Sequence, residues 1–300
     1  MQKLFKLRNQ YDFMLSVTSL SSYSYCPRKL FITSILEIRE PEKAEFVAGN
    51  IHHKVFDAIN KKEKEIVEGI NDKKSEKDIK KMYLIAYSSV LNEVLAVEKE
   101  KIERFDLEKL DIIEDMVVAM DAEADIRAEN VFNFIEKHNI FGKELWEKLE
   151  PKIETEVRVI SEDLDLSGIV DRLEIYKDFC IPYEIKTGKT PREGIWPGHK
   201  IQISAYALMI ENVSDKKVKE GYVVYAENNE KRKVLFNPFL EQEVKQLIHR
   251  IKEMFDSMEI PKRAVNDNKC VRCGLKDICF NDNRIREMIE KKKTSKQIAY

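Results

Sequence analysis

The chain has 300 residues, of which 43% are apolar and 9% aromatic, so it can bury a core in one large domain or two smaller ones. Lysine and arginine number 52 and aspartate and glutamate 54, which gives a net charge of −2 and excludes a polycation of the histone kind. The sequence has no run of 18 or more apolar residues and no secretory cleavage site, so we expect a cytoplasmic protein without membrane spans. Its five cysteines are too few for a disulfide scaffold, and clustered cysteines therefore indicate metal.

The first part of the chain, residues 1–53, is an N-terminal segment in which we predict one short helix. Ser21 or Ser22 is predicted to cap this helix, which carries Cys26. Pro27 fits its early turn, because the first turn of a helix does not need the backbone donor that proline lacks.

Residues 54–150 are predicted to form a helical insertion. The stretch has no proline and two glycines, and apolar residues recur in it at helical spacing, as at Ile113, Met116, Val117 and Met120. Acidic residues outnumber basic ones in this stretch. Two roles stay open: the helices arch over the active site to form a passage for single-stranded DNA, or they are solvated helices without such a role.

Residues 151–260 contain short runs rich in Val, Ile, Tyr and Phe, which predict strands. Residues 261–300 form a last part, in which a loop-like stretch with three cysteines precedes a basic tail. The order of elements predicts an α/β fold with a mixed central sheet flanked by helices. The predicted strands lie at 153–160, 166–176, 179–187, 221–227 and 233–237, and the predicted helices at 198–212 and 239–257.

Asp171, Glu184 and Lys186 point most directly to chemistry, because they lie on two consecutive predicted strands joined by a short turn. Glu184 and Lys186 are two residues apart on a strand and so project from one face. If Asp171 points to that face, the two carboxylates and the backbone carbonyl of Ile185 offer hard oxygen ligands for Mg²⁺ or Mn²⁺. Lys186 would then orient the water that attacks a phosphodiester. The alternative is a surface ion pair between Glu184 and Lys186.

Four of the five cysteines form a candidate ligand set. Cys270, Cys273 and Cys279 are spaced as C-x2-C-x5-C, and Cys26 lies far upstream in Y-x-x-C-P-R-K. Four thiolates suit a 4Fe-4S cluster or a structural Zn²⁺, and the spacing leaves both open. Cys180 lies in a predicted strand and is interpreted as a small buried hydrophobe.

Three motifs in a fixed order carry a family resemblance. They are G-I-V-D at 168–171, Y-E-I-K-T-G at 183–188 and Q-I-S-A-Y at 202–206. In this order they resemble motifs of the RecB-like nucleases of the PD-(D/E)XK superfamily. The resemblance implies a RecB-like nuclease core with the long helical stretch inserted into it.

The resemblance also implies roles for residues outside the acidic strand pair. The family has a histidine that follows a glycine on an upstream helix, and Gly49-Asn-Ile-His52-His53 implies that His53 is a metal ligand beside Asp171 and Glu184. Gln202 and Tyr206 are implied to touch DNA or to steady the catalytic lysine. A histidine or a tyrosine without such a role is the alternative in each case.

One cysteine before the nuclease core and three after it resemble the iron–sulfur form of this fold. The chain is most similar to the CRISPR-associated RecB-like exonuclease family of the adaptation module. This implies a 4Fe-4S cluster held by Cys26, Cys270, Cys273 and Cys279, joining the N- and C-terminal regions.

The implied function is that of a Mg²⁺- or Mn²⁺-dependent deoxyribonuclease, an exonuclease acting on single-stranded DNA or overhangs, in which prespacer ends are processed during CRISPR spacer acquisition. The implied partners are DNA and CRISPR integrase proteins. Two alternatives stay open: a repair or recombination nuclease outside CRISPR, and a non-catalytic DNA-binding subunit of an integrase complex.

Overall fold

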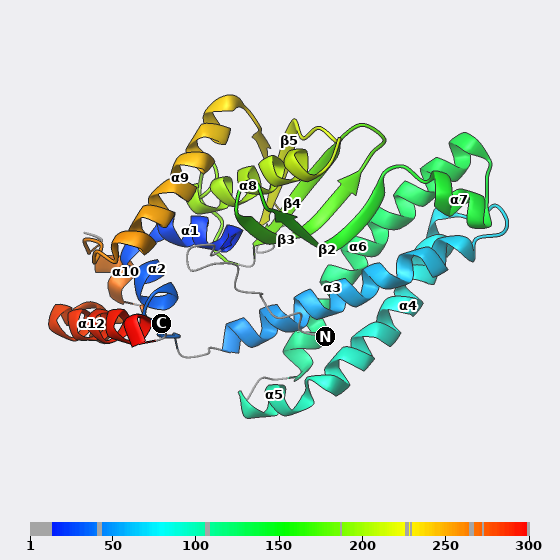
Figure 1. The fold of residues 1–300 in the computed structure, drawn as a ribbon. Helices are drawn as coiled ribbons and strands as arrows, with labels where there is room; N and C mark the ends of the chain where they lie inside the picture. The colour runs from blue at the N-terminus through cyan, green and yellow to red at the C-terminus, as the bar shows by residue number, and fades with distance from the viewer. Residues whose placement is uncertain are drawn as a thin grey trace. The chain divides into compact units, whose positions relative to one another are not determined.

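The computed structural model describes residues 14–40, 44–105, 109–186, 188–225, 228, 230–263, 267–271 and 273–298 (Figure 1). Thr187 of the Y-E-I-K-T-G motif and parts of the predicted N-terminal segment and C-terminal stretch lie outside these residues. Within them the chain forms two compact units. The first unit comprises residues 1–41, 158–168 and 184–300, and the second comprises residues 42–157 and 169–183.

The described strands form a six-stranded sheet in the order β1, β3, β4, β5, β6, with β2 paired to β3. The pair β1–β3 is parallel, whereas β3–β4 and β5–β6 are antiparallel, so the predicted mixed sheet is confirmed. In the β3–β4 pair, Arg172 lies opposite Tyr183 and Ile175 opposite Cys180. The strands are β1 Leu15–Ser16, β2 Lys152–Ser161, β3 Leu166–Ile175, β4 Cys180–Lys186, β5 Glu220–Tyr225 and β6 Glu230–Leu235.

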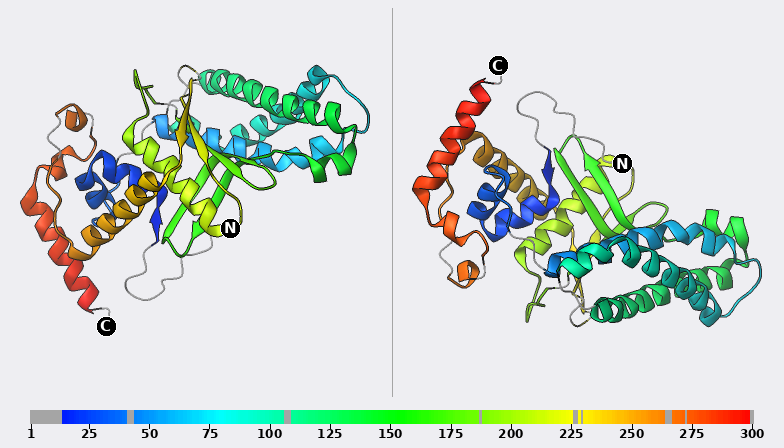
Figure 2. Two further views of the ribbon diagram at one scale, coloured as in Figure 1. Left: turned by 90° about the horizontal axis from the view of Figure 1, so that it is seen from above. Right: turned by 90° about the horizontal axis from the view of Figure 1, so that it is seen from below.

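Helix α8 is the central helix of the first unit, because every residue from Ile201 to Ile210 is buried. A helix that is buried on all sides must be covered on all sides. Helix α8 accordingly packs against α1, α9 and β5, and Figure 2 shows α1, α8 and α9 side by side. The helices of this unit are α1 Val17–Tyr25, α2 Pro27–Ser34, α8 Pro197–Val213, α9 Pro238–Ser257, α10 Asp267–Val271, α11 Lys276–Cys279 and α12 Asp282–Ile298.

Two short helices stand where the sequence predicted one, and the predicted caps Ser21 and Ser22 are wrong because both lie inside α1. Helix α1 instead begins after Ser16, whose hydroxyl accepts a backbone N–H of the first turn. Cys26 separates α1 from α2, and Pro27 is the first residue of α2, as predicted.

The three C-terminal cysteines are associated with short helices, so the predicted loop-like stretch is wrong in this respect. Cys270 lies in α10, Cys279 ends α11, and Cys273 lies between the two helices. Helices of four or five residues are too short to produce a visible helical periodicity in the sequence.

The second unit is mainly helical, which confirms the predicted helical region. Figure 1 shows the long helices α3, α4 and α6 side by side, and they contact one another. Met116 and Met120 are buried in their core as predicted, whereas Val117 is 49% exposed and its predicted place on that face is wrong. No helix in the described ranges is long and apolar enough to cross a membrane. The helices are α3 Ala44–Glu68, α4 Glu76–Val97, α5 Lys99–Arg104, α6 Lys109–His138 and α7 Gly142–Lys148.

A buried network of charges joins these helices to the sheet strand β3. Arg127 of α6 is completely buried and donates to Glu63 of α3 at 2.6 Å and to Glu123 at 2.8 Å. Arg172 of β3 donates to the other oxygen of Glu123 at 3.3 Å. Buried charges persist when they are paired in this way. The network therefore ties α3 and α6 to the strand that carries Asp171.

Candidate active-site groups

The second unit holds a group of three possible metal ligands, contributed by α3, β2 and β3. The Nδ1 atom of His53 lies 2.7 Å from Oε1 of Glu156 and 4.0 Å from Oδ1 of Asp171. The three ligand atoms all lie within 4.8 Å of one another. Asp171 is 7% exposed, whereas the His53 side chain is half exposed, so the group is partly buried and reachable from solvent. Two carboxylates and an imidazole can together hold one divalent ion.

Glu156 is the residue of this group that the sequence reasoning missed. Its backbone φ is +53°, in the left-handed region that residues other than glycine adopt uncommonly. Such an interruption inside a strand redirects side chains, as bulges do beside functional sites. The available signal was an acid placed inside an apolar strand, the same signal that singled out Glu184.

His52 differs from its neighbour His53 in its environment. Its ring stacks on Phe56 with centroids 4.6 Å apart. Burial, and to a smaller extent the adjacent His53, lower the pKa of His52 from 6.5 to about 4. His52 is therefore neutral near pH 7 and packs against Phe56, whereas His53 pairs with Glu156.

The first unit holds a second group, formed by the end of β4 and by α8. Glu184 is 3% exposed, and its Oε1 lies 2.6 Å from Nζ of Lys186. Lys186 Nζ also donates to the side-chain oxygen of Gln202 at 3.0 Å, and Gln202 Nε2 donates to Glu184 at 2.6 Å. The hydroxyl of Tyr206 lies 3.3 Å from the same Nε2. Gln202 thus fixes both the carboxylate and the amine.

Gly168 explains why the G-I-V-D and Q-I-S-A-Y motifs occur together. A Cβ at Gly168 would lie 2.6 Å from Cε1 of Tyr206 and 2.9 Å from Cγ2 of Val17. Tyr206 is 2% exposed, so its ring cannot move out to solvent. Only glycine leaves room for this tyrosine, which in turn lies against Gln202.

The structure places the predicted site residues in these two groups. His53 lies with Asp171, and Glu184 and Lys186 lie with Gln202 and Tyr206. Because Glu184 is buried, its pairing with Lys186 is not the surface ion pair considered as the alternative. The catalytic and metal-binding roles, including that of the Ile185 carbonyl, remain predictions.

A model of the PD-(D/E)XK nuclease superfamily matches residues 14–280, which is most of the chain. The chain belongs to the PD-(D/E)XK nuclease superfamily. Both groups of polar residues lie inside the matched range.

Several curated relatives share part of their sequence with this superfamily member. The "CRISPR-associated exonuclease Cas4/endonuclease Cas1 fusion" of Leptospira interrogans serogroup Icterohaemorrhagiae serovar Lai (strain 56601) is 31% identical over 148 residues, which are 46% of this chain and 27% of that protein. The fusion of the same name from Myxococcus xanthus (strain DK1622) is 27% identical over 46% of this chain and 25% of its own. The "CRISPR-associated exonuclease Cas4" of Rhodospirillum rubrum (strain ATCC 11170) is 30% identical over 41% of this chain and 37% of its own.

The matches therefore cover well under half of each of these relatives. Among solved structures, the crystal structure of SSO0001 aligns over 91% of this chain and 89% of its own, with 15% identity and a TM-score of 0.35. A TM-score this low supports no inference about this chain.

Four of the five cysteines, Cys26, Cys270, Cys273 and Cys279, belong to the first unit. Burial raises the pKa of Cys279, Arg28 opposes this shift, and the nearby thiols of Cys26 and Cys273 add to it. Among the described residues, the group of His, Cys, Asp or Glu side chains whose ligand atoms all lie within 4.8 Å of one another is that of the second unit. The iron–sulfur cluster stays a prediction. Cys180 is 2% exposed, as expected for a buried residue of β4.

Direct polar bonds hold the N- and C-terminal regions of the first unit together. Arg28 of α2 donates to the carbonyl of Pro261 at 2.9 Å and to that of Cys279 at 2.8 Å. The Lys269 ammonium donates to the carbonyl of Tyr25 at 2.9 Å. The N- and C-terminal regions are therefore joined, as predicted, by hydrogen bonds that do not involve a cluster.

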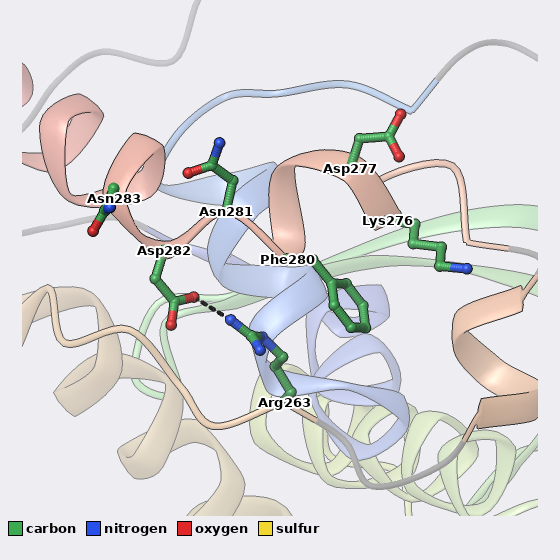
Figure 3. A pocket seen from close by; sticks show the side chains of 7 residues that line it. All are labelled: Arg263, Lys276, Asp277, Phe280, Asn281, Asp282 and Asn283. Carbon is green, nitrogen blue, oxygen red and sulfur yellow. Dashed lines mark hydrogen bonds and ion pairs between the residues drawn. The ribbon is translucent and has the colours of Figure 1, made fainter.

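A cavity of about 580 Å³ lies beside α11 and the start of α12 (Figure 3). Arg263 lies over the ring of Phe280 and pairs with Asp282 at 2.8 Å. No residue of either candidate group is among the residues that line this cavity. Its lining residues are Arg263, Lys276, Asp277, Phe280, Asn281, Asp282 and Asn283.

Proposed function

We propose that this chain is a metal-dependent deoxyribonuclease that acts as an exonuclease. The observation that carries the proposal is the close approach of His53, Glu156 and Asp171 in a member of a nuclease superfamily. The donor set of two carboxylate oxygens and one imidazole nitrogen suits Mn²⁺ or Mg²⁺. Glu184 and the carbonyl of Ile185 are the further ligands that the sequence predicts.

A divalent ion at such a site supplies positive charge to the phosphoryl oxygens and lowers the pKa of water. The residues of the chain do the remaining work. His53, Glu156 and Asp171 would hold the ion, and Lys186 would orient the attacking water through its ammonium group. Gln202 keeps Lys186 in place, because its side-chain oxygen accepts from Nζ at 3.0 Å. Tyr206 steadies Gln202 in turn.

The proposed substrate is single-stranded DNA or an overhang, and the proposed setting is prespacer end processing in CRISPR spacer acquisition. The names of the relatives support this setting, since several describe an exonuclease fused to an endonuclease called Cas1. A CRISPR integrase is accordingly the proposed partner. A repair or recombination nuclease outside CRISPR uses the same chemistry, and gene neighbourhood separates the two.

We also propose that Cys26, Cys270, Cys273 and Cys279 hold a 4Fe-4S cluster. Support comes from four thiols that belong to one unit, two of which, Cys26 and Cys273, raise the pKa of Cys279. The role would be structural, because the cluster would join segments that already share hydrogen bonds. A protein with visible iron–sulfur absorption and matching iron content supports the cluster, and a colourless zinc-containing protein contradicts it.

A cleavage assay with a matched lysine control tests the nuclease proposal. Pure protein is incubated with Mn²⁺ or Mg²⁺ and with single-stranded DNA labelled at either the 5′ or the 3′ end. We expect shortening of the DNA by the wild type and by Lys143→Ala, which changes an exposed lysine on α7. Lys186→Ala should bind DNA and leave it intact.

Two outcomes contradict the proposal. Full activity of Lys186→Ala would remove the lysine from the mechanism. Binding without cleavage by the wild type, in every metal tested, would favour the non-catalytic DNA-binding subunit instead.

A further inference from the structure

The segment that follows Lys186 in the first unit is held in one conformation by an arginine. Arg232 of β6 donates through Nη2 to the carbonyl of Pro191 at 2.7 Å and through Nη1 to the carbonyl of Gly194. Gly194 has a φ of +65°, which suits glycine. A single guanidinium therefore fixes the backbone that leads into α8.

This fixed backbone carries an exposed indole. Trp196 donates its backbone N–H to the hydroxyl of Tyr225 at 3.3 Å, and its Nε1–H to the carbonyl of Lys189 at 2.9 Å. Both donors of Trp196 are thus satisfied within the protein, yet the residue is 46% exposed. An indole that is anchored by its polar atoms and open on its surface loses little side-chain entropy when it binds a flat ligand.

The Tyr225 hydroxyl, which accepts the Trp196 backbone N–H, also contacts a histidine whose pKa the charge of Lys186 lowers. His199, one turn into α8, shares the Tyr225 hydroxyl through its Nδ1 at 3.2 Å. Burial and then the charge of Lys186 lower the pKa of His199 from 6.5 to about 4. Because the Tyr225 oxygen receives the Trp196 N–H, its own proton is available to His199 Nδ1, which favours the tautomer that keeps its proton on Nε2.

We propose that Trp196 is a stacking platform for a nucleobase of single-stranded DNA whose backbone passes Lys186. The inference deepens the proposed function by naming a residue that selects the substrate. Nucleobases and aromatic side chains stack favourably whatever the base, because every base has a π-face. In a duplex both faces of each base are already stacked, so the platform favours unpaired DNA. The neutral imidazole of His199 adds an uncharged donor near the same strand.

Intrinsic fluorescence reports on this platform directly, because the chain has two tryptophans. In a Trp146→Phe variant Trp196 is the single tryptophan, and it is excited at a wavelength that the 11 tyrosines do not absorb. The variant is titrated with oligothymidine in EDTA, which prevents cleavage, and with a blunt duplex of the same length. We expect quenching by the single strand and little change with the duplex.

Anisotropy with a labelled oligothymidine measures affinity in variants of the otherwise unchanged chain. Trp196→Ala should bind roughly 5- to 150-fold more weakly, from the usual worth of one base–aromatic stack. Trp196→Phe should recover most of the loss, which a merely structural role at the start of α8 would not explain. Phe239→Ala, which changes an aromatic residue that is 83% exposed on α9, is the control and should bind as the wild type.

The outcomes separate this inference from the proposed nuclease activity. Quenching and the Trp196→Ala defect in a protein that never cuts DNA would sustain the platform and refute the nuclease. Cleavage by a protein whose Trp196 is not quenched, or whose Trp196→Ala variant binds normally, would refute the platform and leave the nuclease standing. If Trp196→Ala melts well below the wild type, the test rests on Trp196→Phe alone. A Trp196→Phe variant of wild-type stability that loses as much affinity for the oligonucleotide as Trp196→Ala would also refute the platform.

Discussion

Replacing Gly168 with alanine should destabilise the first unit and loosen the Lys186 group. The added Cβ would lie 2.6 Å from a ring carbon of Tyr206 and 2.9 and 3.2 Å from Val17 carbons, where favourable contacts between carbons need about 3.5–4.0 Å. Overlaps of this size in a packed core cost about 1–3 kcal/mol. At about 2–4 °C per kcal/mol, the melting temperature should fall by roughly 2–12 °C.

Circular dichroism melts of four variants test this reasoning: Gly168→Ala, Gly49→Ala, Tyr206→Ala and the double variant Tyr206→Ala/Gly168→Ala. Gly49→Ala is the opposite control, because nothing lies within 4 Å of its new Cβ inside α3, and a helical glycine replaced by alanine should gain up to about 1 kcal/mol. In a Tyr206→Ala background the closest contact of the added methyl group is gone while the two Val17 contacts stay, so its penalty should shrink by about 1 kcal/mol or more without vanishing. An unchanged melting temperature for Gly168→Ala, or an equal penalty in both backgrounds, would refute the explanation of the motif.

Three further changes have defined outcomes. Arg127→Met leaves two buried glutamates without their guanidinium, so denaturant unfolding should report a loss of about 3–5 kcal/mol, and a loss below about 1 kcal/mol would mean that the network is unimportant. In Lys186→Ala, NMR titration should show that the pKa of His199 rises from about 4, while burial keeps it below 6.5. The free energy of unfolding of the wild type should fall as the pH drops from 6.5 to 4, and that of the variant should fall over a narrower pH range. An unchanged pKa in the variant would contradict the electrostatic effect of Lys186 on His199. Cys279→Ser should lower the iron content of purified protein if the cluster is present, and identical iron content would remove that cysteine from the ligand set.

The sequence predicted those parts of the fold and of the site in which the residues concerned lie close together along the chain. The strands around Asp171 and Glu184 were predicted from short runs rich in Val, Ile, Tyr and Phe, and α8 lies where the sequence predicts a helix at 198–212. Gln202 and Tyr206 are four apart on that helix, which places both on the face that meets Lys186 and Gly168.

Features set by backbone conformation or by long-range partners were not predictable in the same way. Glu156 contacts His53, and its backbone has a positive φ that the sequence does not predict. The buried Arg127 looks in the sequence like any charged residue on a solvated helix, because its partners lie on other elements. The helices that hold Cys270 and Cys279 are too short for periodicity to appear.

Calorimetric titration with Mn²⁺ measures whether His53, Glu156 and Asp171 bind a divalent ion, and it requires neither DNA nor turnover. The variants to compare are Glu156→Gln and its matched control Glu154→Gln, a half-buried acid two residues earlier on β2. We expect that the wild type and Glu154→Gln bind the ion and that Glu156→Gln binds it at least tenfold more weakly, which is a loss of about 1.4 kcal/mol of binding free energy. Equal binding by Glu156→Gln, or no binding by the wild type, would contradict this expectation.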